Sequence, residues 1–269
     1  MKSKDISSQD IYFSYRIDIS EPQFLFESHC HSSYEILYIR NGEGRYMVEG
    51  SSFPVSSGTL MVNRPFEYHM VEIKNISEEM PYERFVIHFS DKSLVNEAAI
   101  LLNKILESDE TSGKYYTPLS LSSDVVSLIE RFDLADKLPD DEKKVYLKIL
   151  LSELIVLLSV CGGEHMTHKE ADLGARVIRY LNDNITKNIS LDKLAKKFFV
   201  SKYYLCRAFK KHNGISVHGY INHKRVMYAK QLIESGETAS GAAYKVGFGD
   251  YSAFYRAYVK TIGKAPTSE

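Results

Sequence analysis

Residues 201–214 read SKYYLCRAFKKHNG, and residues 250–263 read DYSAFYRAYVKTIG. The two segments share a candidate N-cap, an apolar stripe, an arginine and a closing glycine, all at one constant offset of 49 residues. The paired positions are Ser201/Asp250, Leu205/Phe254, Arg207/Arg256, Phe209/Tyr258 and Gly214/Gly263. Apolar residues recur at helical spacing on one side, and basic residues lie on the other. The repeat therefore predicts two amphipathic helices of the same kind, each with an exposed polar face.

A short helix is predicted before each of these segments. Ser190 can cap the stretch LDKLAKKF, and AAYKVGFG precedes Asp250. Two such helices joined by a tight turn form a helix-turn-helix, whose second helix enters the major groove of DNA. An ordinary helical hairpin is the alternative for either copy alone, and the duplication argues against it.

The segment between the copies predicts a connecting helix that Gly236 closes. Its apolar residues Tyr220, Val226, Ala229 and Ile233 recur at helical spacing. A helix of about 18 residues spans about 27 Å. Successive major-groove faces are roughly 34 Å apart, so one chain could place two recognition helices on one side of a duplex.

The charge of the chain is divided unevenly along its length. The net charge of the 269 residues is −1, but the part from Asp172 onward holds 17 Lys and Arg against 7 Asp and Glu. This asymmetry favours a polyanion-binding C-terminal domain attached to an acidic one. Two solvated faces of opposite sign are the plainer alternative.

The segment from about 173 to 269 resembles the DNA-binding domain of the AraC/XylS family of transcription regulators. The first copy matches the family pattern S-x-x-x-L-x-R-x-F-K, and VGFGDYSAFYR matches the pattern of the second. The family usually has Ile where this chain has Ala239 and Ala242, Phe at Tyr258 and Lys at Val259. The chain also stops at APTSE, before the aromatic-arginine pair that usually follows. These departures predict that the second copy binds DNA more weakly than the first.

The resemblance implies which residues contact DNA. Arginine can bind guanine through two hydrogen bonds, whereas lysines contact phosphates without sequence preference. The implied base-contacting residues are Tyr203, Cys206, Arg207, Tyr251, Ser252, Tyr255 and Arg256. The expected phosphate contacts are Lys202, Lys210, Lys211 and Lys260. For Tyr203 and Tyr255, a partly buried structural role is the alternative.

Residues 12–90 show the alternating apolar pattern of short strands, including FLFE at 24–27. The period of two would place His29, His31 and Glu35 on one strand face, and His88 alternates with Val86 toward the same interior. The spacing H-x-H-x3-E-x6-G with a later G-x10-H ending at His69 resembles the two motifs of cupin barrels.

In metal-dependent cupins, the positions of His29, His31, Glu35 and His69 hold a divalent ion, and such donors suit a transition metal. Sensor barrels of AraC-type regulators often share this pattern. We therefore expect a small polar effector, such as a sugar, in a barrel mouth lined by His29, His31, Glu35, His69 and His88. We expect no cofactor. The alternatives are a divalent metal at the first four residues, a metal-dependent cupin enzyme with a helical appendage, and histidines with only a surface role.

Residues 91–165 are predicted to form helices that join the two halves. One of them carries a leucine stripe from Leu147 to Leu158. Such a stripe packs either on the barrel or on its copy in a second chain. The resemblance favours a homodimer through this helix, and GGEHMTHKE at 162–170 is predicted to be a linker.

The predicted fold class is α+β. An N-terminal cupin-like β-barrel at 1–90 is followed by a helical linker and dimerisation region at 91–165 and an all-α domain with two helix-turn-helix units at 166–269. Three unevenly spaced cysteines and the absence of an apolar N-terminal segment favour a cytoplasmic protein. The DNA-binding motif is longer and more specific than the cupin motif, so we expect a regulator that is not an enzyme. Its expected partners are double-stranded DNA, an effector, a second copy and RNA polymerase, with no membrane segment.

Overall fold

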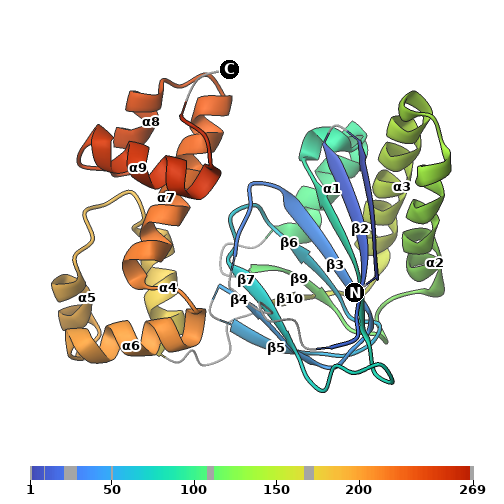
Figure 1. The fold of residues 1–269 in the computed structure, drawn as a ribbon, viewed down its shortest axis with the longest axis horizontal. Coiled ribbons are helices and arrows are strands. Elements are labelled where there is room, and N and C mark those ends of the chain that lie inside the picture. Colours follow the sequence, from blue (N-terminus) through green and yellow to red (C-terminus); the bar gives the residue numbers. More distant parts are fainter. Residues whose placement is uncertain are drawn as a thin grey trace. The chain divides into compact units, whose positions relative to one another are not determined.

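The computed structural model describes residues 2–8, 10–20, 29–49, 51–107, 112–166 and 173–266. The chain divides into two compact units, which are described separately (Figure 1). The sheet unit comprises Met1–Glu27, Ser33–Val48 and Ser52–Thr167, and the helical unit comprises Ser28–Ser32, Glu49–Ser51 and His168–Glu269. None of the described helices is long and apolar enough to cross a membrane.

The sheet unit contains two sheets, and the α+β fold class predicted from the sequence is confirmed. The larger has the order β1-β2-β8-β3-β6-β9-β10, and the smaller has the order β5-β4-β7. The strands are β1 (Lys2–Ser8), β2 (Ile11–Asp18), β3 (Tyr34–Asn41), β4 (Gly44–Val48), β5 (Ser51–Val55), β6 (Leu60–Asn63), β7 (His69–Ile73), β8 (Tyr82–Phe89), β9 (Ser112–Tyr116) and β10 (Glu164–Met166).

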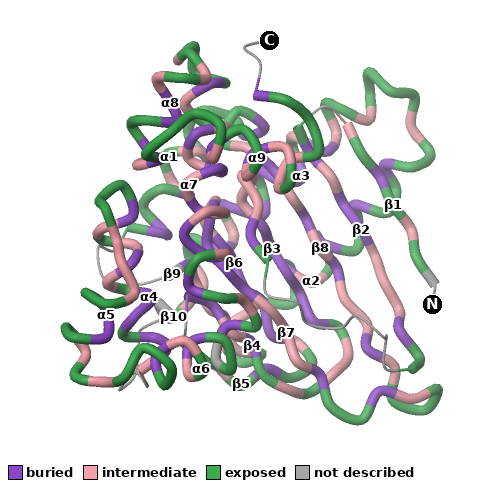
Figure 2. Tube along the Cα trace, turned by 60° about the vertical axis from the view of Figure 1, so that its left-hand side comes forward, coloured by how far each residue is buried: buried purple, intermediate pink, exposed green. Residues whose placement is uncertain are grey.

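Strand β3 shows how the larger sheet is buried on both faces. Its even-numbered Ile36 and Tyr38 belong to a core shared with the helices, whereas Leu37 and Ile39 belong to a second core with residues of the smaller sheet. Successive side chains of a strand point to opposite faces, so Glu35 lies on the face of Leu37 and Ile39. Figure 2 shows the buried centre of this sheet along β3 and β8.

Three helices cover the other face of the larger sheet (Figure 1): α1 (Asn96–Leu106), α2 (Ser123–Arg131) and α3 (Asp140–Val160). Short 3-10 turns occur at Asp91–Ser93 and Phe132–Lys137. The leucine stripe of α3 is at most 1% exposed, and its leucines pack in the core with the sheet and with α1 and α2. The stripe is thus used inside the unit, and it is not available to a second chain.

Two predicted segments, the linker at 162–170 and the strand at 24–27, are not found as predicted in the described part of the chain. The predicted linker at 162–170 is wrong at Glu164–Met166, which form β10 and pair with β9. The conformation of such a short segment depends on pairing with a strand that is distant in the sequence. The composition of residues 164–166 alone does not indicate that β9 is the pairing strand. The strand predicted at 24–27 lies outside the described residues.

The helical unit contains α4 (Leu173–Asp183), α5 (Leu191–Lys197), α6 (Lys202–Asn213), α7 (Val217–Glu234), α8 (Ala239–Lys245) and α9 (Tyr251–Ile262). Helices α5 and α6 form the first predicted helix-turn-helix, and α8 and α9 form the second. Side chains of Ser190, Ser201, Thr238 and Asp250 accept a backbone N–H three residues later, so these four helices begin with capped ends. The predicted connecting helix is α7, which is 18 residues long.

Candidate functional site

A row of polar residues crosses the face of the larger sheet that is turned toward the second core. Glu35 on β3 pairs in register with His88 on β8 and with Asn63 on β6, and His88 pairs with Tyr12 on β2. Four neighbouring strands therefore present Tyr12, His88, Glu35 and Asn63 side by side, and we call this set the Glu35 row. Residues directly opposite on paired strands have neighbouring side chains, which brings these polar groups together.

The Glu35 carboxylate is the centre of this row. Its Oε1 accepts a hydrogen bond of 2.9 Å from Nδ2 of Asn63 and lies 3.3 Å from Nε2 of His69. Its Oε2 lies 3.5 Å from Nε2 of His88. Glu35, Asn63 and His69 are buried, whereas the side chain of His88 is 27% exposed. Within the sheet unit, the structure thus brings together Glu35, His69 and His88.

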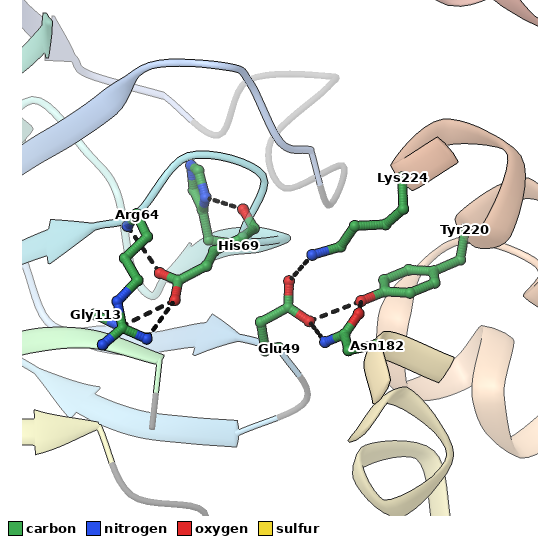
Figure 3. Close-up of polar contacts among 8 residues, drawn as sticks. Glu49, Arg64, His69, Gly113, Asn182, Tyr220 and Lys224 are labelled. Atoms are coloured by element: carbon green, nitrogen blue, oxygen red, sulfur yellow. Dashed lines mark hydrogen bonds and ion pairs between the residues drawn. The ribbon is translucent and has the colours of Figure 1, made fainter. Parts of the chain in front are cut away.

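The position of His69 is set by the turn before β7. Nδ1 of His69 lies 2.8 Å from the carbonyl oxygen of Glu67 (Figure 3). The other ring nitrogen, Nε2, is thereby directed toward Glu35. The buried Glu67 carboxylate in turn accepts hydrogen bonds from the backbone N–H groups of Arg64 and Gly113, at 2.9 and 3.1 Å. This fixed turn holds the imidazole ring in one orientation.

Electrostatics favour a charged His69 beside Glu35. Burial alone would lower the pKa of His69, but the negative charge and the hydrogen bond of Glu35 raise this pKa overall. Burial, and then the charge of Glu35, raise the pKa of Tyr46 well above its usual range. The Tyr46 ring lies 6.2 Å from the His69 ring in a stacked arrangement. Its phenol therefore stays protonated and can donate a hydrogen bond.

Several buried polar atoms near this row have no hydrogen-bond partner among the described residues: the hydroxyl groups of Tyr46 and Tyr82, and Oδ1 of Asn63. Buried polar groups in native proteins are almost always hydrogen-bonded, and exceptions point to a bound water, ion or ligand. The set offers donors and acceptors for hydroxyl or carbonyl groups. The carboxylate and imidazoles are also a donor set that a transition metal accepts.

His29 and His31 do not follow the predicted strand pattern. Strand β3 begins at Tyr34, and His31 lies outside any strand, so both histidines precede the strand that carries Glu35. Both belong to the segment Ser28–Ser32, which is part of the helical unit. Sequence reasoning also missed Asn63, Glu67 and Tyr46, because nothing local in the sequence shows which strands pair.

The first recognition helix, α6, presents the predicted DNA-contacting residues on its outer face. Leu205 and Phe209 are fully buried, whereas Tyr203 is 76% exposed. The other exposed residues on this helix include Lys202, Arg207, Lys210 and Lys211, and Cys206 is half-buried. Lys202 forms an ion pair of 2.7 Å with Asp192 of α5.

The second recognition helix, α9, has the same arrangement. Phe254 and Tyr258 are buried in a core that also contains Ala242. The residues predicted to contact DNA are all exposed: Tyr251, Ser252, Tyr255, Arg256 and Lys260. Both copies therefore carry an arginine-containing face that is not needed by the core.

The helical unit also contains a buried ion pair that sequence reasoning missed. Oε1 of Glu49 lies 2.6 Å from Nζ of Lys224 on α7 (Figure 3). Its Oε2 accepts hydrogen bonds from Nδ2 of Asn182 and from the hydroxyl group of Tyr220, at 2.6 and 2.7 Å. Burial alone would raise the pKa of Glu49, but the charge of Lys224 and these hydrogen bonds lower it overall. The carboxylate is therefore ionised and fully bonded.

Comparisons with known proteins agree with this architecture. A family model described as an AraC-like ligand binding domain matches residues 13–105, and one described as a helix-turn-helix domain matches residues 194–268. The chain is 24% identical over 252 residues to the HTH-type transcriptional activator RhaS of Enterobacter sp. (strain 638), covering 91% of this chain and 87% of that protein. RhaS of Escherichia coli O6:H1 is 23% identical over 259 residues with the same coverage.

Two solved structures also match parts or most of the chain, both with low TM-scores. ToxT from Vibrio cholerae O395, bound to (E)-4-(8-methylnaphthalen-1-yl)but-3-enoic acid, matches with a TM-score of 0.40 and 15% identity over 96% of this chain and 97% of its own. The DNA-binding domain of AdpA in complex with a target DNA matches with a TM-score of 0.34 and 21% identity over 36% of this chain and 87% of its own. The low TM-scores give these two likenesses no weight in the assignment. On its two family models and its relatives, the chain belongs to the AraC family of transcriptional regulators, with an N-terminal ligand-binding domain and a C-terminal helix-turn-helix domain.

Proposed function

We propose that this regulator binds a small polar effector at the Glu35 row and adjusts its action on DNA in response. The observation that supports this most directly is the buried Glu35 carboxylate, which meets two imidazoles and an amide beside polar atoms that lack partners among the described residues. A polyhydroxylated molecule such as a sugar fits these donors and acceptors, because each hydroxyl can both donate and accept.

A thermal-shift screen of sugars and small metabolites against the whole protein tests this proposal. A ligand that binds only the folded state raises the melting temperature by an amount set by its affinity. The His88→Ala variant should lose most of this rise while keeping a stable fold, since the His88 side chain is 27% exposed. If the His88→Ala and Glu35→Gln variants keep the same ligand-induced rise in melting temperature, the effector does not bind at the Glu35 row.

A resident metal ion is not needed for the proposed role. Each imidazole already meets one oxygen of Glu35, and this pairing can hold an effector without an ion. The melting temperature should therefore be the same with and without a chelator. The purified protein would contradict this if it held one transition-metal ion per chain and the Glu35→Gln variant held none. The site would then be assigned to a metal ion and not to an effector. The relatives are transcriptional regulators, so the enzyme alternative is not favoured.

The proposed DNA contacts are the exposed faces of α6 and α9. Arg207 and Arg256 would contact guanine edges, with Tyr203, Cys206, Tyr251, Ser252 and Tyr255 as their neighbours. The exposed lysines 202, 210, 211 and 260 would contact phosphates. Contact with RNA polymerase and a cytoplasmic location remain predictions of the same proposal.

A homodimer through α3 is also part of the proposal, but with different residues from the leucine stripe. Val145, Ile149, Val156 and Val160 are 46–79% exposed and follow one another along the helix, and we call them the outer stripe. Val145 and Val160 lie equally far from the point between Ser152 and Glu153 on this helix, and so do Ile149 and Val156. An antiparallel pair of α3 helices related by a two-fold axis would therefore match apolar residues with apolar residues.

A further inference from the structure

The turn between the two helices has the same hydrogen bonds in both helix-turn-helix copies. In the first copy, Phe199 N–H donates to the carbonyl oxygen of Lys196, and Val200 N–H donates to that of Ala195. In the second copy, Gly247 N–H donates to Tyr244 and Phe248 N–H donates to Ala243. Phe199 and Gly247 therefore occupy the same position in the two turns, after the end of α5 and of α8.

This position requires a left-handed backbone. Gly247 has a φ of 94°, and Phe199 has a φ of 56°. Glycine adopts this conformation without penalty, whereas a bulky side chain there is an outlier. A Cβ atom at Gly247 would lie 2.4 Å from the carbonyl oxygen of Thr186, so the second copy needs glycine. The first copy carries an aromatic residue in the same strained conformation.

Packing within the chain does not explain Phe199, because this residue is 94% exposed. Backbone strain that persists without a packing benefit is found preferentially at functional positions. Covering an exposed phenylalanine ring with a binding partner removes apolar surface from water, which is favourable.

The surroundings of Phe199 fit a polyanion. The residue lies beside a shallow hollow that Lys196, Val200 and Lys202 also line. Exposed lysines outnumber acidic residues here, with Lys193, Lys196, Lys197 and Lys202 against Asp192. Phe199 also lies two residues before the N-cap of α6, and the N-terminal residues of a recognition helix are those that contact DNA bases.

We infer that the Phe199 ring packs on apolar groups of DNA, a deoxyribose or a thymine methyl group, at the edge of the groove that α6 enters. Phenylalanine contacts with the thymine methyl are an established mode of DNA recognition in general. The lysines around the ring would neutralise the neighbouring phosphates. This inference rests on the proposed DNA contact of α6 and adds to it a contact made through the strained turn.

The experiment compares Phe199→Gly with the wild-type protein on a duplex that the wild-type protein selects from random sequences. Glycine relieves the left-handed strain, so the melting temperature should rise by about 2–4 °C. The loss of the ring contact should weaken DNA binding about tenfold at every salt concentration. The salt dependence of binding should not change, because no charge is removed, whereas Lys196→Ala should reduce it.

Matched variants make the outcomes distinct. Phe199→Leu should keep most of the affinity, and Leu119→Ser, which removes another exposed apolar side chain, should keep all of it. Unchanged DNA binding in Phe199→Gly, with a loss in Arg207→Ala, would overturn this inference alone. Loss of transcription with unchanged DNA binding would assign the ring to a protein partner instead. No selected duplex, or no loss in Arg207→Ala, would overturn the proposed DNA contact itself.

Discussion

Glu35 is the residue on which the proposed effector site depends. It is 4% exposed and meets His69, His88 and Asn63, which come from three other strands. A buried carboxylate is stable only when paired and hydrogen-bonded, so these neighbours stabilise its charge in the absence of effector. An effector that enters must replace or extend these bonds, and this requirement favours a ligand with several hydrogen-bonding groups.

The His69–Glu35 pair should make stability depend on pH. The pKa of His69 is raised in the folded protein, so its contribution to stability is complete below the ordinary value of 6.5 and is lost as pH rises through the folded pKa. The free energy of unfolding should therefore fall as the pH rises above about 6.5. Urea unfolding at several pH values on both sides of this pH measures the free energy of unfolding.

His69→Gln is the control, and it should flatten this slope. His223 does not interfere, because burial lowers its pKa to about 4 and its contribution changes only below the ordinary histidine value. The prediction fails if the wild-type protein and His69→Gln show the same slope above this pH.

Replacing only one residue of the Glu49–Lys224 pair should lower the stability of the folded protein. Both residues are at most 5% exposed, and Lys224→Met would leave the Glu49 charge buried without its counter-ion. Removing one partner of such a pair typically destabilises by about 3–5 kcal/mol. Chemical unfolding should show this loss, and the double variant Glu49→Gln with Lys224→Met should recover part of it. A double variant less stable than Lys224→Met would contradict the argument.

At the scale of elements, α3 has two apolar faces with different roles. The leucine face joins α1, α2 and the sheet in one core, while the outer stripe stays exposed. Sequence reasoning identified the apolar helix but not the division of its residues between these faces. Leucine and valine positions both satisfy an apolar pattern, so only the observed burial separates core from surface.

The outer stripe leads to a test of the homodimer. Ile149→Glu with Val156→Glu places charges on the proposed contact, where they would be buried unpaired, and dimers should become monomers. Sedimentation of both proteins measures the mass. Ile100→Glu is the matched control, since Ile100 is 68% exposed on α1. A wild-type monomer, or the same mass for wild type and variant, would exclude α3 from any dimer contact.

At the scale of the whole molecule, the helical unit was more predictable from sequence than the sheet unit. Caps, stripes and closing glycines are local signals, and the predicted Ser201 and Asp250 caps are confirmed. The Glu35 row joins residues up to 76 positions apart through strand pairing, and its register follows only from the folded sheet. For the same reason, the sequence predicted Glu35 and His88 as site residues but not Asn63, which donates a hydrogen bond to Glu35.

The two helix-turn-helix copies should contribute unequally to DNA binding. Arg207→Ala should weaken binding to the selected duplex by about 1–3 kcal/mol and relax the preference at one base pair. Arg256→Ala should cost less, because the second copy departs more from the family pattern. Lys211→Ala should weaken binding to all duplexes alike and reduce the salt dependence.

Titrations across salt concentrations and base-pair substitutions measure these effects. Lys144→Ala, on α3 of the sheet unit, is a control for removing an exposed positive charge elsewhere. Equal and sequence-independent losses for both arginines would contradict base recognition by this face.

The exposed tyrosines of α6 and α9 also give the protein a built-in optical signal. The chain has 19 tyrosines and no tryptophan, so its intrinsic fluorescence comes from phenol rings alone. Four of these rings, at 203, 204, 251 and 255, are 38–76% exposed on the two recognition helices. Stacking against or hydrogen bonding to DNA would quench their emission, while the buried tyrosines of the sheet unit would keep theirs. Binding to an unlabelled duplex can therefore be followed directly by the loss of tyrosine fluorescence.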